Sequence, residues 1–327
     1  MIKMTAALLT LVAFIIAAIA ASILIGGPGH PPPMQSVSDP FKSVDFSDLP
    51  PIQRYSARDG AQLAYRTYRP SARDSKGSII LVHGSSSRGD RIHPLAKGFA
   101  LAGFVVYVPD MRGHGESGTK GQIAYVGQLE DDLEDLLQAV RPSGKKSLVG
   151  FSAGGGFALR FSADKRASLF DNYLLLSPFL SQDASTYRPA SGGWASVGTP
   201  RILSLLLLNR IGITSLNTLP VVTYALSPEA QKFLTPYYSF QLAMNFRPHN
   251  NYRADIAATR QPMEVLVGEQ DDQFYSERFA SEFSVAATPV TVSIIPATGH
   301  IGLTTTQVAI QAAVAAVNRL DAIPSKT

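Results

Sequence analysis

The 327-residue chain contains no cysteine and a single tryptophan. The lack of cysteine excludes disulfide bonds, thiolate nucleophiles and cysteine-ligated zinc or iron–sulfur centres. Charged residues make up 17% of the chain and apolar residues 45%, a balance typical of a folded protein of one large or two small domains. The net charge of +4 is scattered, with no run of Lys and Arg, so nucleic acid is not expected as a partner.

Charge is also missing from residues 5–27, which are almost wholly Ala, Leu, Ile, Val and Phe. About 20 apolar residues in a helix span the roughly 30 Å hydrocarbon core of a bilayer. We therefore expect a transmembrane signal anchor at 5–27, behind a short tail at 1–4. A cleaved signal peptide is the alternative, with Ala18-Ile19-Ala20 as its cleavage site. The apolar run continues past that site to Ile25, which favours the anchor; a buried core helix is the third alternative.

Basic residues flank this segment unevenly, because Lys3 precedes it and no further Lys or Arg occurs before Lys42. The positive-inside bias then places the main domain on the extracytoplasmic side of a single-pass membrane protein. Cleavage of the segment would instead release a secreted protein. Residues 28–51 are rich in Pro, Ser and Asp, which predicts a semi-rigid linker holding the globular part off the bilayer.

From residue 52 the chain alternates short apolar runs with helical patterns. The runs lie at 78–82, 104–108, 147–151, 173–176, 263–267 and 290–295. This alternation is typical of a parallel sheet covered by helices on both faces. It stops between 181 and 253, so we expect a core in two parts, 52–180 and 254–327, separated by an inserted, mostly helical cap.

One of the expected helices, at 129–140, carries an acidic cluster in its first turn: Glu130, Asp131 and Asp132. Basic residues lie at and beyond its end. This order of charges complements the helix dipole. We interpret the cluster as a solvated helix face rather than as a metal site.

The strongest local motif is Gly150-Phe151-Ser152-Ala153-Gly154, a G-x-S-x-G sequence between an expected strand and an expected helix. A nucleophilic serine must project from a sharp turn between the two, and the flanking glycines let the backbones pass without Cβ clashes. We therefore predict Ser152 as the nucleophile, against the alternative of a glycine-rich structural turn.

A serine nucleophile needs a base and an acid that orients the base. His300 lies in the loop after the run at 290–295, and such loops at strand ends gather the sites of open α/β sheets. Three carboxylates follow the run at 263–267. We select Asp271 as the acid, ahead of Asp272 and then Glu269, which gives the chain order Ser, Asp, His that is usual for this motif.

The oxyanion formed by the attack needs preorganised N–H donors. The residue after the nucleophile, Ala153, supplies one, and Ser85, in the loop after the run at 78–82, is expected to supply the other. His83, in the same loop, is interpreted as structural. This chemistry requires neither a metal nor a cofactor.

Several motifs occur together in this chain: His83-Gly84, Asp110-Met111-Arg112-Gly113-His114-Gly115-Glu116-Ser117, Gly150 to Gly154, Gly268 to Asp271 and Gly299-His300. With these motifs, the chain from residue 52 to its end resembles the α/β-hydrolase superfamily, in particular the monoacylglycerol lipase, lysophospholipase and serine aminopeptidase branch. The resemblance implies an α/β-hydrolase fold with a mostly parallel sheet, to which this chain adds the cap and the N-terminal transmembrane helix. It also implies that Asp110 and His114 belong to a structural loop.

We therefore expect a serine hydrolase that cleaves carboxylic esters, lysophospholipid-like or monoacylglycerol-like, through an acyl-enzyme. A leucine-rich run at 203–208 in the cap must pack on the core, line an acyl pocket or touch the bilayer. One alternative is a proline-type aminopeptidase, which needs a cap carboxylate such as Asp183 or Glu229 for the substrate's amino group. Another is a membrane-tethered protein that keeps the fold without turnover.

Overall fold

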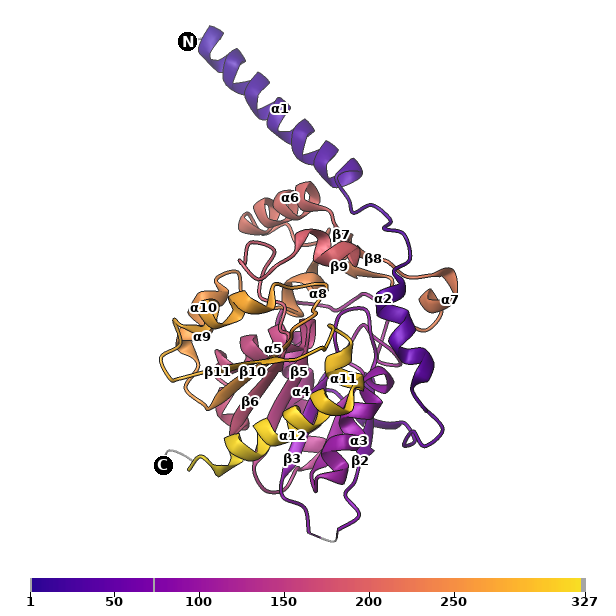
Figure 1. Cartoon of the computed structure of the whole chain (residues 1–327). Helices are drawn as coiled ribbons and strands as arrows, with labels where there is room; N and C mark the ends of the chain where they lie inside the picture. The colour runs from indigo at the N-terminus through magenta and orange to yellow at the C-terminus, as the bar shows by residue number, and fades with distance from the viewer. Residues whose placement is uncertain (1, 73, 325–327) are drawn as a thin grey trace.

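An eight-stranded sheet forms the centre of the globular part (Figure 1). The computed structural model describes residues 2–72 and 74–324. The strand order is β1-β2-β4-β3-β5-β6-β10-β11. The strands are β1 (Gln53–Ser56), β2 (Gln62–Tyr68), β3 (Ser78–Val82), β4 (Val105–Pro109), β5 (Lys146–Phe151), β6 (Asn172–Leu176), β10 (Met263–Gly268) and β11 (Thr291–Ile295).

β2 runs antiparallel to both of its neighbours, β1 and β4, while all other neighbouring pairs in this sheet are parallel. The mostly parallel sheet expected from the alternating pattern is thus confirmed. β1 was not anticipated, because only its residue Tyr55 is buried and the other three are polar and exposed. Such an edge strand lacks the apolar run that marks the central strands.

The core divides into two layers, one on each face of the sheet. Along β3, Ile80 and Val82 pack on one face and Ile79 and Leu81 on the other, as the two-residue repeat of a strand requires. The second face is covered by α3 (His93–Leu101), α11 (Gly302–Thr305) and α12 (Gln307–Ala322). The first is covered by α4 (Gln128–Val140), α5 (Ala153–Ser162), α9 (Tyr252–Ala258) and α10 (Phe279–Phe283).

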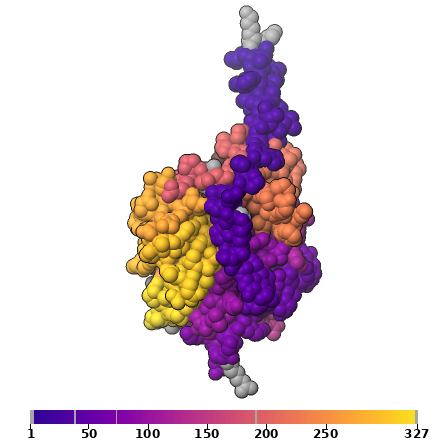
Figure 2. All heavy atoms as spheres, turned by 45° about the vertical axis from the view of Figure 1, so that its right-hand side comes forward, coloured from indigo at the N-terminus to yellow at the C-terminus, as the bar shows by residue number. Residues whose placement is uncertain are grey.

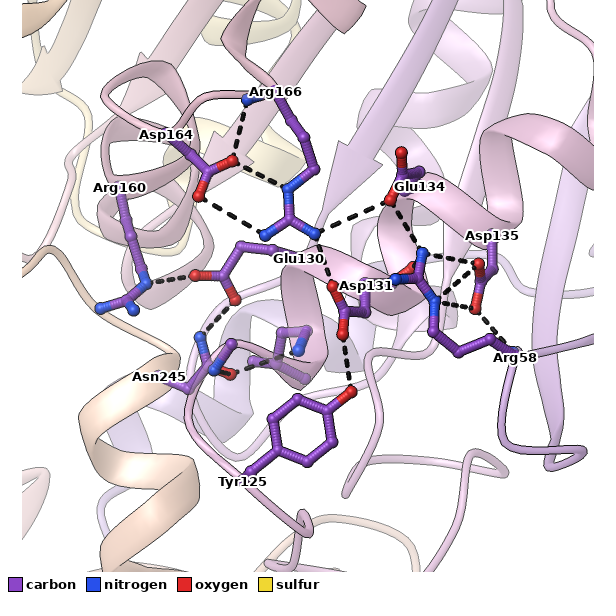
Figure 3. A network of polar contacts seen from close by, with 12 residues as sticks. Arg58, Tyr125, Glu130, Asp131, Glu134, Asp135, Arg160, Asp164, Arg166 and Asn245 are labelled. Carbon is purple, nitrogen blue, oxygen red and sulfur yellow. Dashed lines mark hydrogen bonds and ion pairs between the residues drawn. The ribbon is translucent and has the colours of Figure 1, made fainter.

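The acidic residues of α4 are not a solvated face, which corrects the sequence-based interpretation. Glu130 is 2% exposed and Asp132 3%, and both are paired with buried arginines, Arg160 and Arg112. Figure 3 shows this arrangement around Glu130 and the neighbouring carboxylates. Charge pairing explains the burial, because an unpaired buried carboxylate would be strongly destabilising. Among the described residues no cluster of three or more His, Asp or Glu side chains is arranged to hold a metal.

The insertion between β6 and β10 is not mostly helical, contrary to the expectation. It contains a separate antiparallel sheet of three strands in the order β7-β8-β9. The strands are β7 (Ala195–Val197), β8 (Pro220–Tyr224) and β9 (Tyr237–Ser239), and the helices are α6 (Thr199–Arg210), α7 (Pro228–Gln231) and α8 (Phe240–Asn245). Three- to five-residue strands are too short for their alternation to stand out from a loop.

The N-terminal helix α1 (Ile2–Ile25) projects away from the globular part (Figure 1). The following segment is not a free spacer, contrary to the expectation for 28–51. It forms α2 (Gln35–Ser38) and a 3₁₀ helix, η1 (Asp39–Ser43), and lies along the surface of the globular part, as Figure 2 shows. Backbone contacts to the insertion, such as the bond from Met34 N–H to the Ala225 carbonyl at 3.0 Å, hold it there.

Candidate active site

Ser152 lies on a sharp turn between β5 and α5, with φ 55° and ψ −118°. A non-glycine residue at positive φ is strained and indicates a functional constraint. The turn brings the backbones so close that a Cβ on Gly150 would stand 2.2 Å from the Gly154 carbonyl oxygen. A Cβ on Gly154 would stand 2.4 Å from the carbonyl oxygen of His83. Both glycines of the motif are therefore sterically required.

His300 and Asp271 form a buried hydrogen-bonded pair at the ends of β11 and β10. The Nδ1 of His300 lies 2.8 Å from Oδ2 of Asp271, and the two side chains are 2% and 0% exposed. This bond orients the imidazole and uses Nδ1, so Nε2 is the ring nitrogen that stays available to another partner. Ser152 and His300 line the same cavity.

Three further donors hold the Asp271 carboxylate in place. Oδ2 accepts a hydrogen bond from Ser177 Oγ at 2.7 Å, and Oδ1 accepts from the N–H groups of Gln273 and Phe274 at 2.8 and 2.9 Å. Burial by itself raises the pKa of Asp271, but His300, Ser177 and the N–H of Gln273 outweigh it and lower the pKa below its ordinary value. The carboxylate thus stays ionised beside the imidazole.

The other two carboxylates that follow β10, Glu269 and Asp272, make different contacts. Glu269 is exposed and accepts a hydrogen bond from the N–H of Ala297 at 2.8 Å. Asp272 is half-buried and lines a separate surface groove. Of the three acids that follow β10, Asp271 alone is hydrogen-bonded to the imidazole among the contacts of the described residues.

Two N–H groups are positioned as candidate oxyanion donors. Ala153 is the first residue of α5, so its N–H has no acceptor within the helix. In the loop after β3, Gly84 lies against Ser152, since a Cβ there would be 3.3 Å from Cβ of Ser152. The N–H of Ser86 donates to the Tyr238 hydroxyl at 2.7 Å, so it is already used, and the N–H of Ser85 stays the candidate donor predicted in this loop.

His83 and His114 serve as clamps between loops. The Nε2 of His83 accepts a hydrogen bond from the N–H of Met111 at 3.1 Å, so Nδ1 carries the proton and donates to the Gly84 carbonyl at 2.8 Å. Burial lowers the pKa of both histidines, that of His114 well below the ordinary value. Both histidines therefore remain neutral. In the neighbouring loop, the Asp110 carboxylate accepts hydrogen bonds from the N–H groups of Gly89 and Glu116. The loop role inferred for Asp110 and His114 agrees with these contacts.

Two cavities meet at Ser152. The larger has a volume of about 540 Å³ and also contacts Gly84, Ser85, Phe151 and His300. The smaller, about 70 Å³, lies under the insertion and is lined by aromatic and aliphatic side chains, by Ser85 and Ala153, and by the polar Gln182, Arg247 and Gln273. Asp39 is the single carboxylate among the described residues lining the larger cavity, and it is ion-paired with Lys42 at 2.8 Å.

Sequence reasoning missed three contributors to this site. Ser177 shares the acid's oxygen, and its positive φ of 39° was not visible in the sequence. Trp194 donates from Nε1 to Ser85 Oγ at 3.0 Å and so braces the oxyanion loop. Residues of the 33–42 segment form part of the cavity wall. The available signals in the sequence were the Ser-Pro pair at Ser177 and the single tryptophan, Trp194.

Comparison with known proteins assigns the family. The family model described as serine aminopeptidase, S33, matches residues 73–301, more than half of the chain. Among curated relatives, a monoacylglycerol lipase of Mycolicibacterium smegmatis is 32% identical over 110 residues, covering 32% of this chain and 38% of that protein. The monoglyceride lipase of Rattus norvegicus is 27% identical over 199 residues, covering 56% and 63%. The chain thus matches between about a third and two thirds of the length of these relatives.

Solved structures share the fold. A soluble variant of monoglyceride lipase from Saccharomyces cerevisiae aligns with a TM-score of 0.59 at 17% identity, covering 86% of this chain and 98% of that one. The monoacylglycerol lipase of Paleococcus ferrophilus aligns with a TM-score of 0.59 at 19% identity, covering 79% and 98%. The α/β-hydrolase fold expected from the motifs is therefore confirmed.

Proposed function

Since this chain belongs to the serine aminopeptidase S33 family of α/β-hydrolases, we propose that it is a serine esterase acting on lipid-like carboxylic esters. The observation that carries the proposal is Ser152 on its strained turn, lining one cavity with a His300 that is bonded to Asp271. Relatives named as monoacylglycerol and monoglyceride lipases support an ester of a fatty acid as the substrate.

In the proposed mechanism, His300 takes the proton from Ser152 as Oγ attacks the ester carbonyl. The N–H groups of Ser85 and Ala153 stabilise the negative charge on the tetrahedral oxygen. His300 then gives its proton to the departing alcohol oxygen, and an acyl-enzyme remains. A water molecule, deprotonated by His300, attacks this acyl group, and His300 returns the proton to Ser152 Oγ as the fatty acid is released. Asp271 stabilises the imidazolium in both halves of the reaction.

The arrangement of carboxylates favours an ester over a peptide with a free amino terminus. An aminopeptidase needs a carboxylate in its cavity to bind the substrate's ammonium group. Asp183 and Glu229, the cap acids considered for this role, are exposed and lie outside the described lining of the larger cavity. Asp39, which does line it, is already paired with Lys42. An uncharged ester therefore suits the cavity better.

The surroundings of α1 favour a substrate delivered from a membrane. The segment Met4–Ile25 has a mean hydropathy of 2.9 and is long enough to cross a bilayer or to act as a signal sequence. Next to its base, α6 exposes Leu203 and Leu207, whereas Leu205 packs into the core. The leucine-rich run thus divides between core and surface. We place the exposed leucines at the lipid headgroups, with the catalytic part on the extracytoplasmic side.

The test of the proposal is the variant Ser152→Ala with a fluorophosphonate probe. The probe reacts with an activated serine, so the wild-type chain should be labelled and Ser152→Ala should not. Ester hydrolysis should fall by several orders of magnitude, since loss of a triad member removes most of the rate enhancement. Retention of more than about a tenth of the activity would exclude Ser152 as the nucleophile. An unlabelled wild-type chain would instead indicate a non-catalytic member of the family.

A further inference from the structure

The segment 33–42, between the N-terminal helix and the core, crosses the face of the molecule at the active-site cavity (Figure 2). It is held at both ends. On the side of the insertion, Met34 N–H bonds to the Ala225 carbonyl at 3.0 Å. On the side of the core, the guanidinium of Arg91 lies 5.1 Å from the ring centre of Phe41, a cation–π distance. The segment therefore bridges insertion and core rather than hanging free.

One side of this segment faces the site. Met34, Val37 and Phe41 are half-buried, and all three line the 540 Å³ cavity that contains Ser152 and His300. Val37 belongs to α2 and Phe41 to η1, while Met34 precedes α2 as its extended N-cap residue; what the three share is the cavity that they border. Across the cavity, the insertion contributes apolar side chains too: Ala225, Leu226, Ala230 and Leu234.

The opposite side of the segment borders a second groove on the surface. Ser36 and Pro40, together with Ser43 and Val44 just after the segment, line this surface groove of about 700 Å³, which also reaches His300. On the side of the larger cavity, Met34, Val37 and Phe41 are accompanied by Gln35 and by the Asp39–Lys42 ion pair, which line the same cavity. An apolar face that borders a cavity is stabilised only when something apolar covers it.

We propose that residues 33–42 are a specificity-determining wall of the substrate site, with Met34, Val37 and Phe41 contacting the acyl chain. This inference rests on the proposed esterase function and assigns the chain to the larger cavity. A volume of 540 Å³ falls in the range of pockets that enclose whole small ligands, whereas 70 Å³ is far below it. The segment that follows the apolar N-terminal helix thus selects the substrate as well as connecting the two parts.

The experiment compares alanine variants of the full chain on p-nitrophenyl esters of two, four and eight carbons. Each buried methylene adds roughly fourfold to binding, so kcat/KM of the wild type should rise with chain length. Phe41→Ala and Met34→Ala should reduce the octanoyl-to-acetyl ratio of kcat/KM by about tenfold, and Val37→Ala by about threefold, because apolar contact to the chain is lost. The matched control is Val44→Ala, the same change on the outer side, which should leave the ratio within about twofold.

Fluorophosphonate labelling of every variant separates the two hypotheses. If Met34→Ala, Val37→Ala and Phe41→Ala are labelled normally and keep the octanoyl-to-acetyl ratio of kcat/KM, the proposed role of residues 33–42 is wrong and the esterase proposal stands. An equal fall in Val44→Ala would also overturn this role, since the effect would then be a general loosening. A wild-type chain that neither reacts nor hydrolyses would refute the esterase itself. Val37→Ala removes the least volume, so it tests the wall even where larger truncations unfold the protein.

Discussion

The carboxylate of Asp271 shows how strongly one side chain of the candidate site is constrained. It is 2% exposed and accepts hydrogen bonds from His300, Ser177 and two backbone N–H groups. A buried anion is costly unless its lone pairs are satisfied, and here both oxygens have donors. The surroundings are therefore built for a charged group rather than for its neutral amide.

The first prediction concerns the choice between adjacent acids. Asp271→Asn should reduce kcat by about 10⁴-fold, because the amide stabilises the wrong imidazole tautomer and no longer stabilises the imidazolium. Asp272→Asn is the matched control and should change kcat by less than about tenfold, since Asp272 lines a surface groove instead. Steady-state kinetics on one ester decides between them; equal losses would contradict the assignment.

A second prediction follows from the lowered pKa of Asp271. The unfolded chain titrates this group near its ordinary value of 3.8, and the folded chain titrates it lower. Its contribution to the free energy of unfolding is therefore full above that ordinary value and is lost as the pH falls through the folded pKa. The stability gap between wild type and Asp271→Asn should be constant near neutral pH and shrink below about pH 4. Urea unfolding across this range measures it; a gap independent of pH would refute it.

The charges of α4 tie separate parts of the molecule together. Glu130 bonds to Arg160 of α5 and, at 2.6 Å, to Nδ2 of Asn245 at the end of α8 in the insertion (Figure 3). Glu134, one turn further along, faces the surface and is 30% exposed beside Arg58 and Arg166. The same residue type on one helix thus occupies a buried and a solvated position.

The third prediction compares these two positions. Glu130→Gln should lower the free energy of unfolding by about 3 kcal/mol, because it leaves the buried cation of Arg160 uncompensated. Glu134→Gln should cost at most about 1 kcal/mol, as expected for a partly exposed pair. Thermal or urea denaturation measures both. If Glu134→Gln lowers the free energy of unfolding as much as Glu130→Gln does, burial does not determine the contribution of these ion pairs.

Taken whole, the molecule places its most apolar surfaces at one end. The helix α1 projects from that end (Figure 1), and α6 packs beside its base. Arg201 of α6 donates from Nε to the Ile23 carbonyl at 2.8 Å and from NH2 to the Leu24 carbonyl at 3.3 Å. A cation at the C-terminal carbonyls of a helix is favourable because of the helix dipole. The helix and the insertion are thereby joined.

The fourth prediction is that this end belongs in a membrane. If α1 stays on the mature protein, the full-length protein should sediment with membranes and resist alkaline carbonate extraction, since about 20 apolar residues anchor a chain stably. Ser152→Ala is a suitable control, because the loss of the nucleophile should not change partitioning. A soluble mature protein whose N-terminus begins near Ala21 would instead demonstrate cleavage of a signal peptide.

The sequence by itself determined the features that depend on near neighbours in the chain. The central strands follow from short apolar runs, and the turn at Ser152 follows from a five-residue motif with glycines where the backbones cross. The loop carrying His300 and the apolar N-terminal helix are equally local. Periodicity and turn chemistry report on residues within a few positions, so these features are readable without the fold.

Tertiary structure alone decided the features whose partners are distant in sequence. Asp271 and Asp272 are chemically identical neighbours, and only the packing of β10 against β11 brings one of them to His300. The acidic face of α4 is buried because Arg160 and Asn245 arrive from other elements, the latter 115 residues away. The position of the segment 33–42 beside the cavity likewise depends on contact with Ala225. Such contacts leave no local pattern, because burial and charge pairing are set by what the folded chain brings together.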